Sequence, residues 1–211
     1  MMRRRRGVRL ARFDWVNGRS APIARFLNSQ AGMAAMTPRV GRIIELLDLA
    51  PGKRYLDIGC GTAPFAHLIA ARAGMDEPPY TLDLLGGAAV DAVAWPEHLP
   101  LRDESFDAIT CLYFMRRFDD DVAHGFGGEL ARILAPGGRA LVIEVAPVKN
   151  ASIERLHRRL LSAGCAEVDL RGWGRLAALF TECGFDAIDL VNVGPFLLPP
   201  IPRVGVLLRR A

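Results

Sequence analysis

The spacing of hydrophobic and polar positions changes once along this chain, near residue 50. Between Ala21 and Leu49 the apolar residues recur at helical spacing, and Thr37 followed by Pro38 predicts a helix start with Thr37 as the N-cap. Pro51-Gly52 is typical of a turn that ends this segment. From residue 54 onward, short apolar runs alternate with helical stretches, which predicts N-terminal helices followed by a strand–helix domain.

Five short apolar runs in the second part are predicted strands. They cover residues 54–58, 80–83, 88–94, 106–112 and 139–145. The last run is almost continuously apolar, as expected of a strand that is covered on both faces. Helical patterns begin at Pro64, end at Leu134 before the turn Pro136-Gly137-Gly138, and recur at 153–161 and 176–183.

Two final apolar runs, 187–193 and 204–208, flank a proline-rich stretch and predict an antiparallel pair at one end of the sheet. Buried strands that alternate with helices are typical of an open, mostly parallel sheet. The predicted fold is therefore α/β: a doubly wound, Rossmann-like sheet of seven strands with an antiparallel C-terminal hairpin. We expect a flexible basic arm at 1–20, a helical segment at 21–50 and the main domain at 51–211.

The net charge of +4 is unevenly distributed. Residues 1–25 hold eight arginines and one aspartate (+7), so the remaining 186 residues carry 19 basic and 22 acidic groups (−3). A nucleic-acid-binding surface needs basic groups clustered on the folded domain, so nucleic acid is not the expected partner. The chain has no run of 18 apolar residues, so no membrane span is predicted. The N-terminal arginines are not followed by the apolar stretch that an export signal has. A cytoplasmic location is therefore expected.

The stretch most informative about chemistry is the turn after the first predicted strand, residues 56–63, which reads Leu-Asp-Ile-Gly-Cys-Gly-Thr-Ala. Glycines at such a turn let the backbone approach a ligand. Asp83 ends the next strand, 22 residues after Gly61, where a carboxylate can accept hydrogen bonds from ribose hydroxyls. Together the turn and the acid predict an adenosine-binding crevice. The alternative is a turn glycine and a strand-end carboxylate with conformational roles only.

With these motifs, residues 54–145 resemble a class I S-adenosylmethionine-dependent methyltransferase. The nearest group is the small-molecule enzymes that include the quinone-biosynthesis C-methyltransferases. The resemblance is carried by the turn at 56–62, the acid Asp83, the segment Leu99 to Asp107, residues 129–139, and Gly184-Phe185 before the last two apolar runs. It extends over about residues 40–211 and implies a methyltransferase with S-adenosylmethionine as cofactor and a small-molecule acceptor.

The resemblance also implies a set of cofactor-binding residues. It places Asp57, Gly59, Cys60 and Gly61 at the methionine part, Asp83 at the ribose, Leu84, Trp95 and Glu97 at the adenine, and Cys111 and Leu112 toward the sulfonium. Trp95 stands where many relatives have an aspartate that binds the adenine amino group, and an indole cannot accept that hydrogen bond. Ala63 replaces a third glycine, and the link from Asp83 to Leu99 is too short for the usual helix.

Methyl transfer is an in-line displacement in which the protein supplies placement and, for a phenol or an activated carbon, a route for the proton. The candidate catalytic residues are Tyr113, Arg116 and His124. Relatives often have two histidines where Arg116 and Arg117 stand. Arginine stays protonated and is a poor base but a good clamp for an anion, which predicts an anionic acceptor held by Arg116. The alternative is that Arg116 lies at the surface or pairs with Asp119 to Asp121.

Three other functions remain open at this point. A nicotinamide-dependent oxidoreductase shares the turn and the acid, although Pro64 stands at the place of its third glycine. A methyltransferase-like binding or partner protein without transfer activity is the second, and a nucleic-acid methyltransferase, supported only by the basic arm, is the third. Residues 14–50 are a candidate lid. The widely spaced cysteines predict no metal site, and the oligomeric state stays open, with a homodimer as one option.

Overall fold

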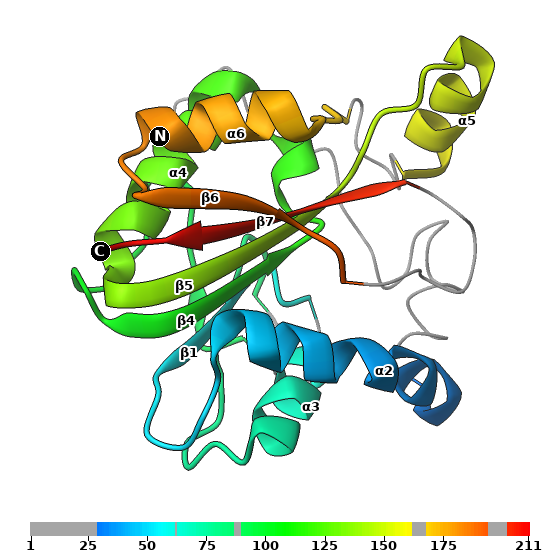
Figure 1. The fold of residues 1–211 in the computed structure, drawn as a ribbon. Helices are drawn as coiled ribbons and strands as arrows, with labels where there is room; N and C mark the ends of the chain where they lie inside the picture. Colours follow the sequence, from blue (N-terminus) through cyan, green and yellow to red (C-terminus); the bar gives the residue numbers. More distant parts are fainter. Residues whose placement is uncertain (1–28, 62, 87–89, 162–167, 194–201) are drawn as a thin grey trace.

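One seven-stranded sheet forms the centre of the protein. The computed structural model describes residues 29–61, 63–86, 90–161, 168–193 and 202–211 (Figure 1). The strands are β1 Tyr55–Ile58, β2 Tyr80–Asp83, β3 Ala92–Val93, β4 Phe106–Leu112, β5 Leu134–Val145, β6 Ala187–Val191 and β7 Arg203–Arg209. Their order in the sheet is β3-β2-β1-β4-β5-β7-β6.

The direction of the strands confirms the predicted topology. β1 to β5 pair in parallel, whereas β7 is antiparallel to both of its neighbours, β5 and β6. The chain order reverses at β1, which lies between β2 and β4, so the carboxyl ends of these strands frame a crevice. Insertion of an antiparallel β7 between β5 and β6 distinguishes this sheet from the 3-2-1-4-5-6 order of the dinucleotide-binding fold.

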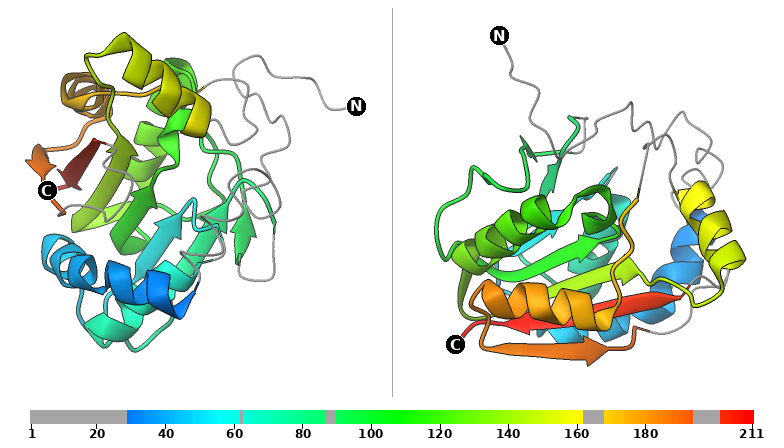
Figure 2. Two further views of the ribbon diagram at one scale, coloured as in Figure 1. Left: turned by 90° about the vertical axis from the view of Figure 1, so that its right-hand side faces the viewer. Right: turned by 90° about the horizontal axis from the view of Figure 1, so that it is seen from above.

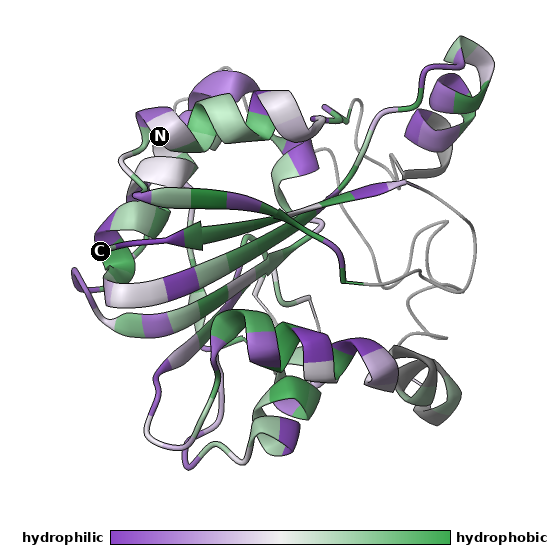
Figure 3. Ribbon diagram, viewed as in Figure 1, coloured by the Kyte–Doolittle hydropathy of each residue, from purple (hydrophilic) through white to green (hydrophobic). Residues whose placement is uncertain are grey.

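Helices cover both faces of the sheet. They are α2 Gln30–Leu47, α3 Pro64–Ala73, the 3₁₀ turn η1 Met115–Arg117, α4 Asp120–Ile133, α5 Ala151–Leu161 and α6 Trp173–Glu182. α2 and α3 lie on one face and α4 and α6 on the other, while α5 lies beyond the carboxyl end of β5 (Figures 1 and 2). Hydrophobic residues line the middle of the sheet between these layers (Figure 3).

The predicted helix start at Thr37-Pro38 is wrong, because Pro38 lies inside α2. A proline in a helix removes one backbone donor and is usually costly. Here the helix continues through it because the residues that follow, Val40, Ile43 and Leu47, are buried in the core between α2 and the sheet. Residues 1–28, which include the basic arm and part of the candidate lid, lie outside the described residues, so the predicted division into arm, lid and domain stays a prediction.

Two predicted strands differ from the structure in extent by more than two residues. β5 begins at Leu134 rather than Arg139, because Leu134 pairs with Phe106 and the register shifts before Ala108. Gly137, with φ of 72°, allows the chain to bend inside this strand. β3 comprises only Ala92–Val93 of the predicted run 88–94, part of which lies outside the described residues. Across the residues that the structure describes, no helix is both long and apolar enough to cross a membrane.

Candidate functional site

The glycine turn after β1 lies at the point where the strand order reverses. Its first two amides both donate to the carbonyl oxygen of Leu82 in β2, at 2.7 Å from Gly59 and 3.3 Å from Cys60. Gly59 and Gly61 have φ values of 76° and 58°, which glycine adopts without steric cost. The turn is therefore attached to β2 and delivers the chain to α3, which begins at Pro64 as predicted.

The two glycines face different surroundings. A Cβ atom on Gly59 would lie 2.5 Å from Cδ2 of Phe114, so this aromatic ring closes one side of the turn. A Cβ on Gly61 would have no atom within 4 Å, so the other side is open. A turn with one packed side and one open side leaves room for a ligand against its backbone, which fits the cofactor that the resemblance implies.

Asp83, at the end of β2, is buried and fixed to the same turn. Its Oδ2 accepts a hydrogen bond from the amide of Gly61 at 2.9 Å, and its Oδ1 accepts one from Leu85 at 3.2 Å. The predicted proximity of the acid and the turn is thus confirmed. Each carboxylate oxygen can accept more than one hydrogen bond, so both oxygens can still bind ribose hydroxyls.

Asp57 ends a buried chain of hydroxyl groups beneath the turn. Its Oδ1 accepts a hydrogen bond from Oγ1 of Thr110 at 2.6 Å, and the hydroxyl of Tyr55 lies 2.7 Å from the same Oγ1. Because the Thr110 proton goes to Asp57, Tyr55 is the donor of the second bond. Burial raises the pKa of Asp57 to about 7, against the lowering effect of the Thr110 hydrogen bond.

This pKa predicts a pH-dependent stability. The native protein keeps a proton on Asp57 that the unfolded chain, with an ordinary pKa of 3.8, releases. Stability from this group is therefore complete below pH 4 and is lost as the pH rises to about 7. We expect the free energy of unfolding of Asp57→Asn, minus that of the native protein, to rise by about 1.4 kcal/mol per pH unit over this interval and then level off. Urea titrations at several pH values measure it, and a constant difference would contradict the assignment.

The residues predicted at the adenine are less tightly gathered. Trp95 is 39% exposed and pairs with His98 in an isolated bridge. Glu97 is half-buried and lies against α4, where its Cγ would be 3.0 Å from a Cβ on Gly125. Residues 84–86 and 90–91 contain no helix, in keeping with the short link after Asp83. The adenine roles of Leu84, Trp95 and Glu97 stay predictions.

Neither of two predicted cofactor-site cysteines is an activated nucleophile. Burial raises the pKa of Cys60 to about 12, and burial also raises that of Cys111, which is fully enclosed in the core. Both thiols are therefore protonated at neutral pH. Cys111 is enclosed in the core, so any contact that it makes with a cofactor would involve its backbone, whereas the adjoining Leu112 is only half-buried. In the described part of the chain, no group of His, Cys, Asp or Glu is arranged to hold a metal ion.

Tyr113 follows β4 in a left-handed conformation, with φ of 58°. Such a φ is strained for a bulky residue and is found mostly at functional sites. Two contacts hold it: its amide donates to Ile143 at 2.7 Å, and its carbonyl accepts from Nη1 of Arg116. Burial raises the pKa of the phenol, so Tyr113 is protonated at neutral pH and is a poor general base.

Arg116 is buried and not at the surface, and its ionic partner is Glu144 rather than Asp119 to Asp121. Its Nη1 lies 3.9 Å from Oε2 of Glu144, whose Oε1 accepts from the amide of Met115 at 2.5 Å. Asp119 instead caps α4 by accepting from Val122. The alternative placement of Arg116 is therefore wrong. Its partner Glu144 lies on β5, 28 residues further along the chain, so the local sequence around Arg116 did not indicate it.

His124 is not brought to the crevice by the contacts described. It is half-exposed on α4, and its Nε2 lies 3.6 Å from Oε2 of Glu182 on α6. Two arginines that the sequence did not single out are instead close to Tyr113 or to η1. Arg203 begins β7, with its Cζ 5.9 Å from the centroid of the Tyr113 ring, and Arg171 is buried beside η1. Neither stands in a motif, so no local signal marked them.

A doubly wound sheet with a glycine turn after β1, a buried acid at the end of β2 that is bonded to this turn, and an antiparallel β7 has the fold of the class I S-adenosylmethionine-dependent methyltransferases. Residues 56–142 match the family model described as a methyltransferase domain. The cofactor that belongs to this domain is S-adenosylmethionine. The open side of the glycine turn and the fixed carboxylate of Asp83 fit its amino-acid and ribose parts.

Comparison with known proteins gives related sequences and related folds. The chain is 37% identical over 108 residues to a demethylmenaquinone methyltransferase of Deinococcus radiodurans, which covers 45% of this chain and 44% of the relative. It is 35% identical over 120 residues to that of a Mycobacterium species (strain KMS), which covers 54% and 51%. The chain thus spans about half the length of these curated relatives.

Solved structures share the fold at low sequence identity. A S-adenosylmethionine-dependent methyltransferase from Thermotoga maritima aligns with a TM-score of 0.61 and 18% identity, over 92% of this chain and 96% of its own. Human N-acetylserotonin methyltransferase, solved in complex with S-adenosylmethionine, aligns with a TM-score of 0.64 and 13% identity, over 93% and 58%. At these identities the likeness shows the fold alone.

Proposed function

We propose that this protein transfers the methyl group of S-adenosylmethionine to a small, phenol-like acceptor that reacts as its anion. The methyltransferase domain over 56–142 supports the reaction class. The names of these two curated relatives, both demethylmenaquinone methyltransferases, support an acceptor of quinone type. A group of arginines at the carboxyl end of the sheet supports the anion, and this is the observation that carries the acceptor class.

The arginines converge on Tyr113. The Cζ atoms of Arg116 and Arg203 each lie 5.9 Å from the centroid of its ring. Burial lowers the pKa of Arg203, and the charge of nearby Arg39 lowers it further. The guanidinium groups of Arg39, Arg116 and Arg203 carry three positive charges, and the carboxylate of Glu144 carries one negative charge. Together these four groups have an excess of positive charge. Such a field, in a partly buried site, stabilises an oxyanion.

The chemistry follows from this field. When bound, S-adenosylmethionine supplies an electrophilic methyl group. The positive charge of Arg116 and Arg203 lowers the pKa of an acceptor hydroxyl, which loses its proton to solvent and becomes nucleophilic at oxygen or at the adjacent carbon. Tyr113 stays protonated and helps to shape the site rather than taking the proton. The new carbon–oxygen or carbon–carbon bond forms as the carbon–sulfur bond breaks, which leaves S-adenosylhomocysteine.

Paired variants on β7 test the proposal. Arg203→Met removes a charge beside Tyr113, whereas Arg209→Met removes one at the other end of the same strand, where Arg209 pairs with exposed Asp189. We expect Arg203→Met to lower kcat/KM for a weakly acidic naphthoquinol by about tenfold to a hundredfold. The kcat/KM for a strongly acidic nitrophenol, which is already ionised in water, should fall much less. Arg209→Met should leave kcat/KM unchanged for both acceptors.

Transfer of labelled methyl groups measures these rates. Equal losses for the weakly and strongly acidic phenols in Arg203→Met would overturn the anionic acceptor. Binding of S-adenosylhomocysteine without transfer to any phenol, quinol or carboxylate would instead favour a methyltransferase-like binding protein.

A further inference from the structure

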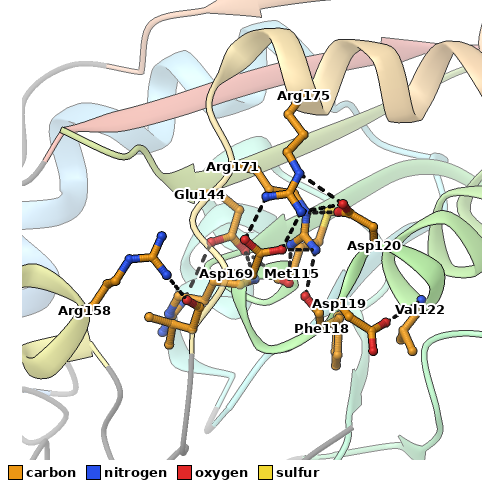
Figure 4. A network of polar contacts seen from close by, with 12 residues as sticks. Met115, Phe118, Asp119, Asp120, Val122, Glu144, Arg158, Asp169, Arg171 and Arg175 are labelled. Atoms are coloured by element: carbon orange, nitrogen blue, oxygen red, sulfur yellow. Dashed lines mark hydrogen bonds and ion pairs between the residues drawn. The ribbon is translucent and has the colours of Figure 1, made fainter. Parts of the chain in front are cut away.

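The segment between α5 and α6 carries an arginine whose charge is almost completely buried. Arg171 is 2% exposed, and each of the three nitrogen atoms of its guanidinium group makes a polar contact (Figure 4). Its Nη1 donates to the carbonyl of Met115 at 3.0 Å and its Nη2 to that of Phe118 at 2.7 Å. Its Nε donates to Oδ1 of Asp120 at 3.0 Å, and Nη2 lies 2.9 Å from Oδ2 of Asp169. The two carboxylates neutralise the buried charge, and the two carbonyls bracket the turn η1.

The same turn is held from two further directions. The amide of Asp169 donates to the carbonyl of Arg116 at 2.8 Å, and Glu144 on β5 accepts from the amide of Met115 at 2.5 Å. η1 is therefore fixed between the end of the sheet and the 168–172 segment. Arg171 reaches both ends of the turn with one planar guanidinium group, through the carbonyls of Met115 and Phe118.

The turn η1 in turn sets the position of Phe114, the residue that precedes it. The Phe114 ring packs edge-on against Phe118 and Phe126, with centroids 4.9 Å and 5.6 Å away. Its Cβ, Cγ and Cδ2 lie so close to Gly59 that no side chain would fit there. A shift of η1 therefore moves the ring that forms the packed side of the cofactor turn, or leaves a gap behind that turn.

We propose that Arg171 is a positioning residue for the cofactor site. Through η1 and Phe114 it holds the packed side of the glycine turn in place, although its own guanidinium group binds the protein and not the cofactor. The inference rests on the proposed function only in requiring that the chain binds S-adenosylmethionine. It connects the segment that follows α5 with the backbone that receives the cofactor.

Arg171→Leu and a matched variant, Arg210→Leu, test the role. Arg210 also donates to backbone carbonyls, those of Ala131 and Leu134, and pairs with Glu104, but it does so near the end of α4 and the start of β5. Both variants should lower the melting temperature, since each leaves buried carbonyls without a donor. Their Kd values for S-adenosylhomocysteine distinguish the two variants. Calorimetric titration measures these values at a temperature where circular dichroism shows that both variants are folded.

We expect Arg171→Leu to raise the Kd by about tenfold or more, since small displacements of a binding site have effects of this size. Arg171→Lys, which reaches fewer of these partners, should be intermediate, and Arg210→Leu should stay within about twofold of the native Kd. A folded Arg171→Leu protein with native affinity would overturn the proposal. Failure of the native protein to bind S-adenosylhomocysteine would refute the proposed function instead.

A second variant covers the case in which Arg171→Leu does not fold. Asp120 has a half-exposed side chain that accepts from Nε of Arg171, so Asp120→Ala weakens the clamp without emptying the core. We expect its Kd to rise by about threefold to tenfold, because only one of the polar contacts of Arg171 is lost and the others still hold η1. Asp103→Ala, which removes an exposed partner of Arg132, is the control with native affinity expected. Equal Kd values for the two variants would count against the role of Arg171.

Discussion

Gly59→Ala should abolish binding of S-adenosylhomocysteine and destabilise the protein by about 2–5 kcal/mol. The left-handed conformation at φ of 76° costs an alanine about 1–2 kcal/mol. The new Cβ would also lie 2.5 Å from Cδ2 of Phe114, and relief of that contact in a packed core costs about 1–3 kcal/mol. Since the turn can move away only by entering the space in front of it, cofactor binding is lost along with stability.

Gly52→Ala separates the two causes. Gly52 has a similar φ of 82°, but a Cβ there would meet no atom within 4 Å, and the residue lies in the turn before β1, at the other end of the strand. It should show the conformational cost alone, about 1–2 kcal/mol, with unchanged binding. Urea unfolding and calorimetric titration measure both quantities. If Gly59→Ala matched Gly52→Ala in both, Phe114 would not be the wall that the geometry indicates.

The central strands were predictable because their apolar runs are short, bounded by turns and mostly buried. β2 and β4 have the expected bounds, and the pairing of β6 with β7 is antiparallel as expected. Continuation of α2 through Pro38 was not predictable from local preferences, because the energy that sustains it comes from burial of Val40, Ile43 and Leu47. Tertiary packing overrode a local signal that usually marks a helix start.

The two halves of the candidate site differ in how well the sequence indicated them. The cofactor half could be predicted because Asp57, the glycine turn and Asp83 belong to consecutive strands whose ends must meet in a doubly wound sheet. The acceptor half could not. Arg203 and Arg171 are more than 50 residues from Tyr113 and η1, and only the antiparallel β7 and the segment before α6 bring them there. The same long-range packing gives Arg116 its partner Glu144 and leaves His124 on an outer helix.

Asp83→Ala should weaken binding of S-adenosylhomocysteine by about a hundredfold, since it removes a charged acceptor for two hydroxyl groups worth about 1.5–3 kcal/mol. In the structure the carboxylate accepts from the amides of Gly61 and Leu85, and its second role, binding of the ribose, is a prediction. Asp83→Asn, which keeps the shape of the side chain and one acceptor oxygen, should bind S-adenosylhomocysteine about tenfold more weakly than the native protein. Asp107→Ala is the matched control, because Asp107 also accepts from a backbone amide, that of Arg54, but at the opposite end of the sheet.

An analogue of the ligand without its 2′-hydroxyl distinguishes the two duties of Asp83. The native protein should bind this analogue more weakly than S-adenosylhomocysteine, whereas Asp83→Ala should bind the two alike, because the partner of the missing hydroxyl is already gone. If Asp83→Ala still preferred the hydroxyl, its lower affinity would come from a displaced Gly61 amide alone. The acid would then act on the turn in the way that Arg171 acts on η1, by placing backbone that the cofactor contacts.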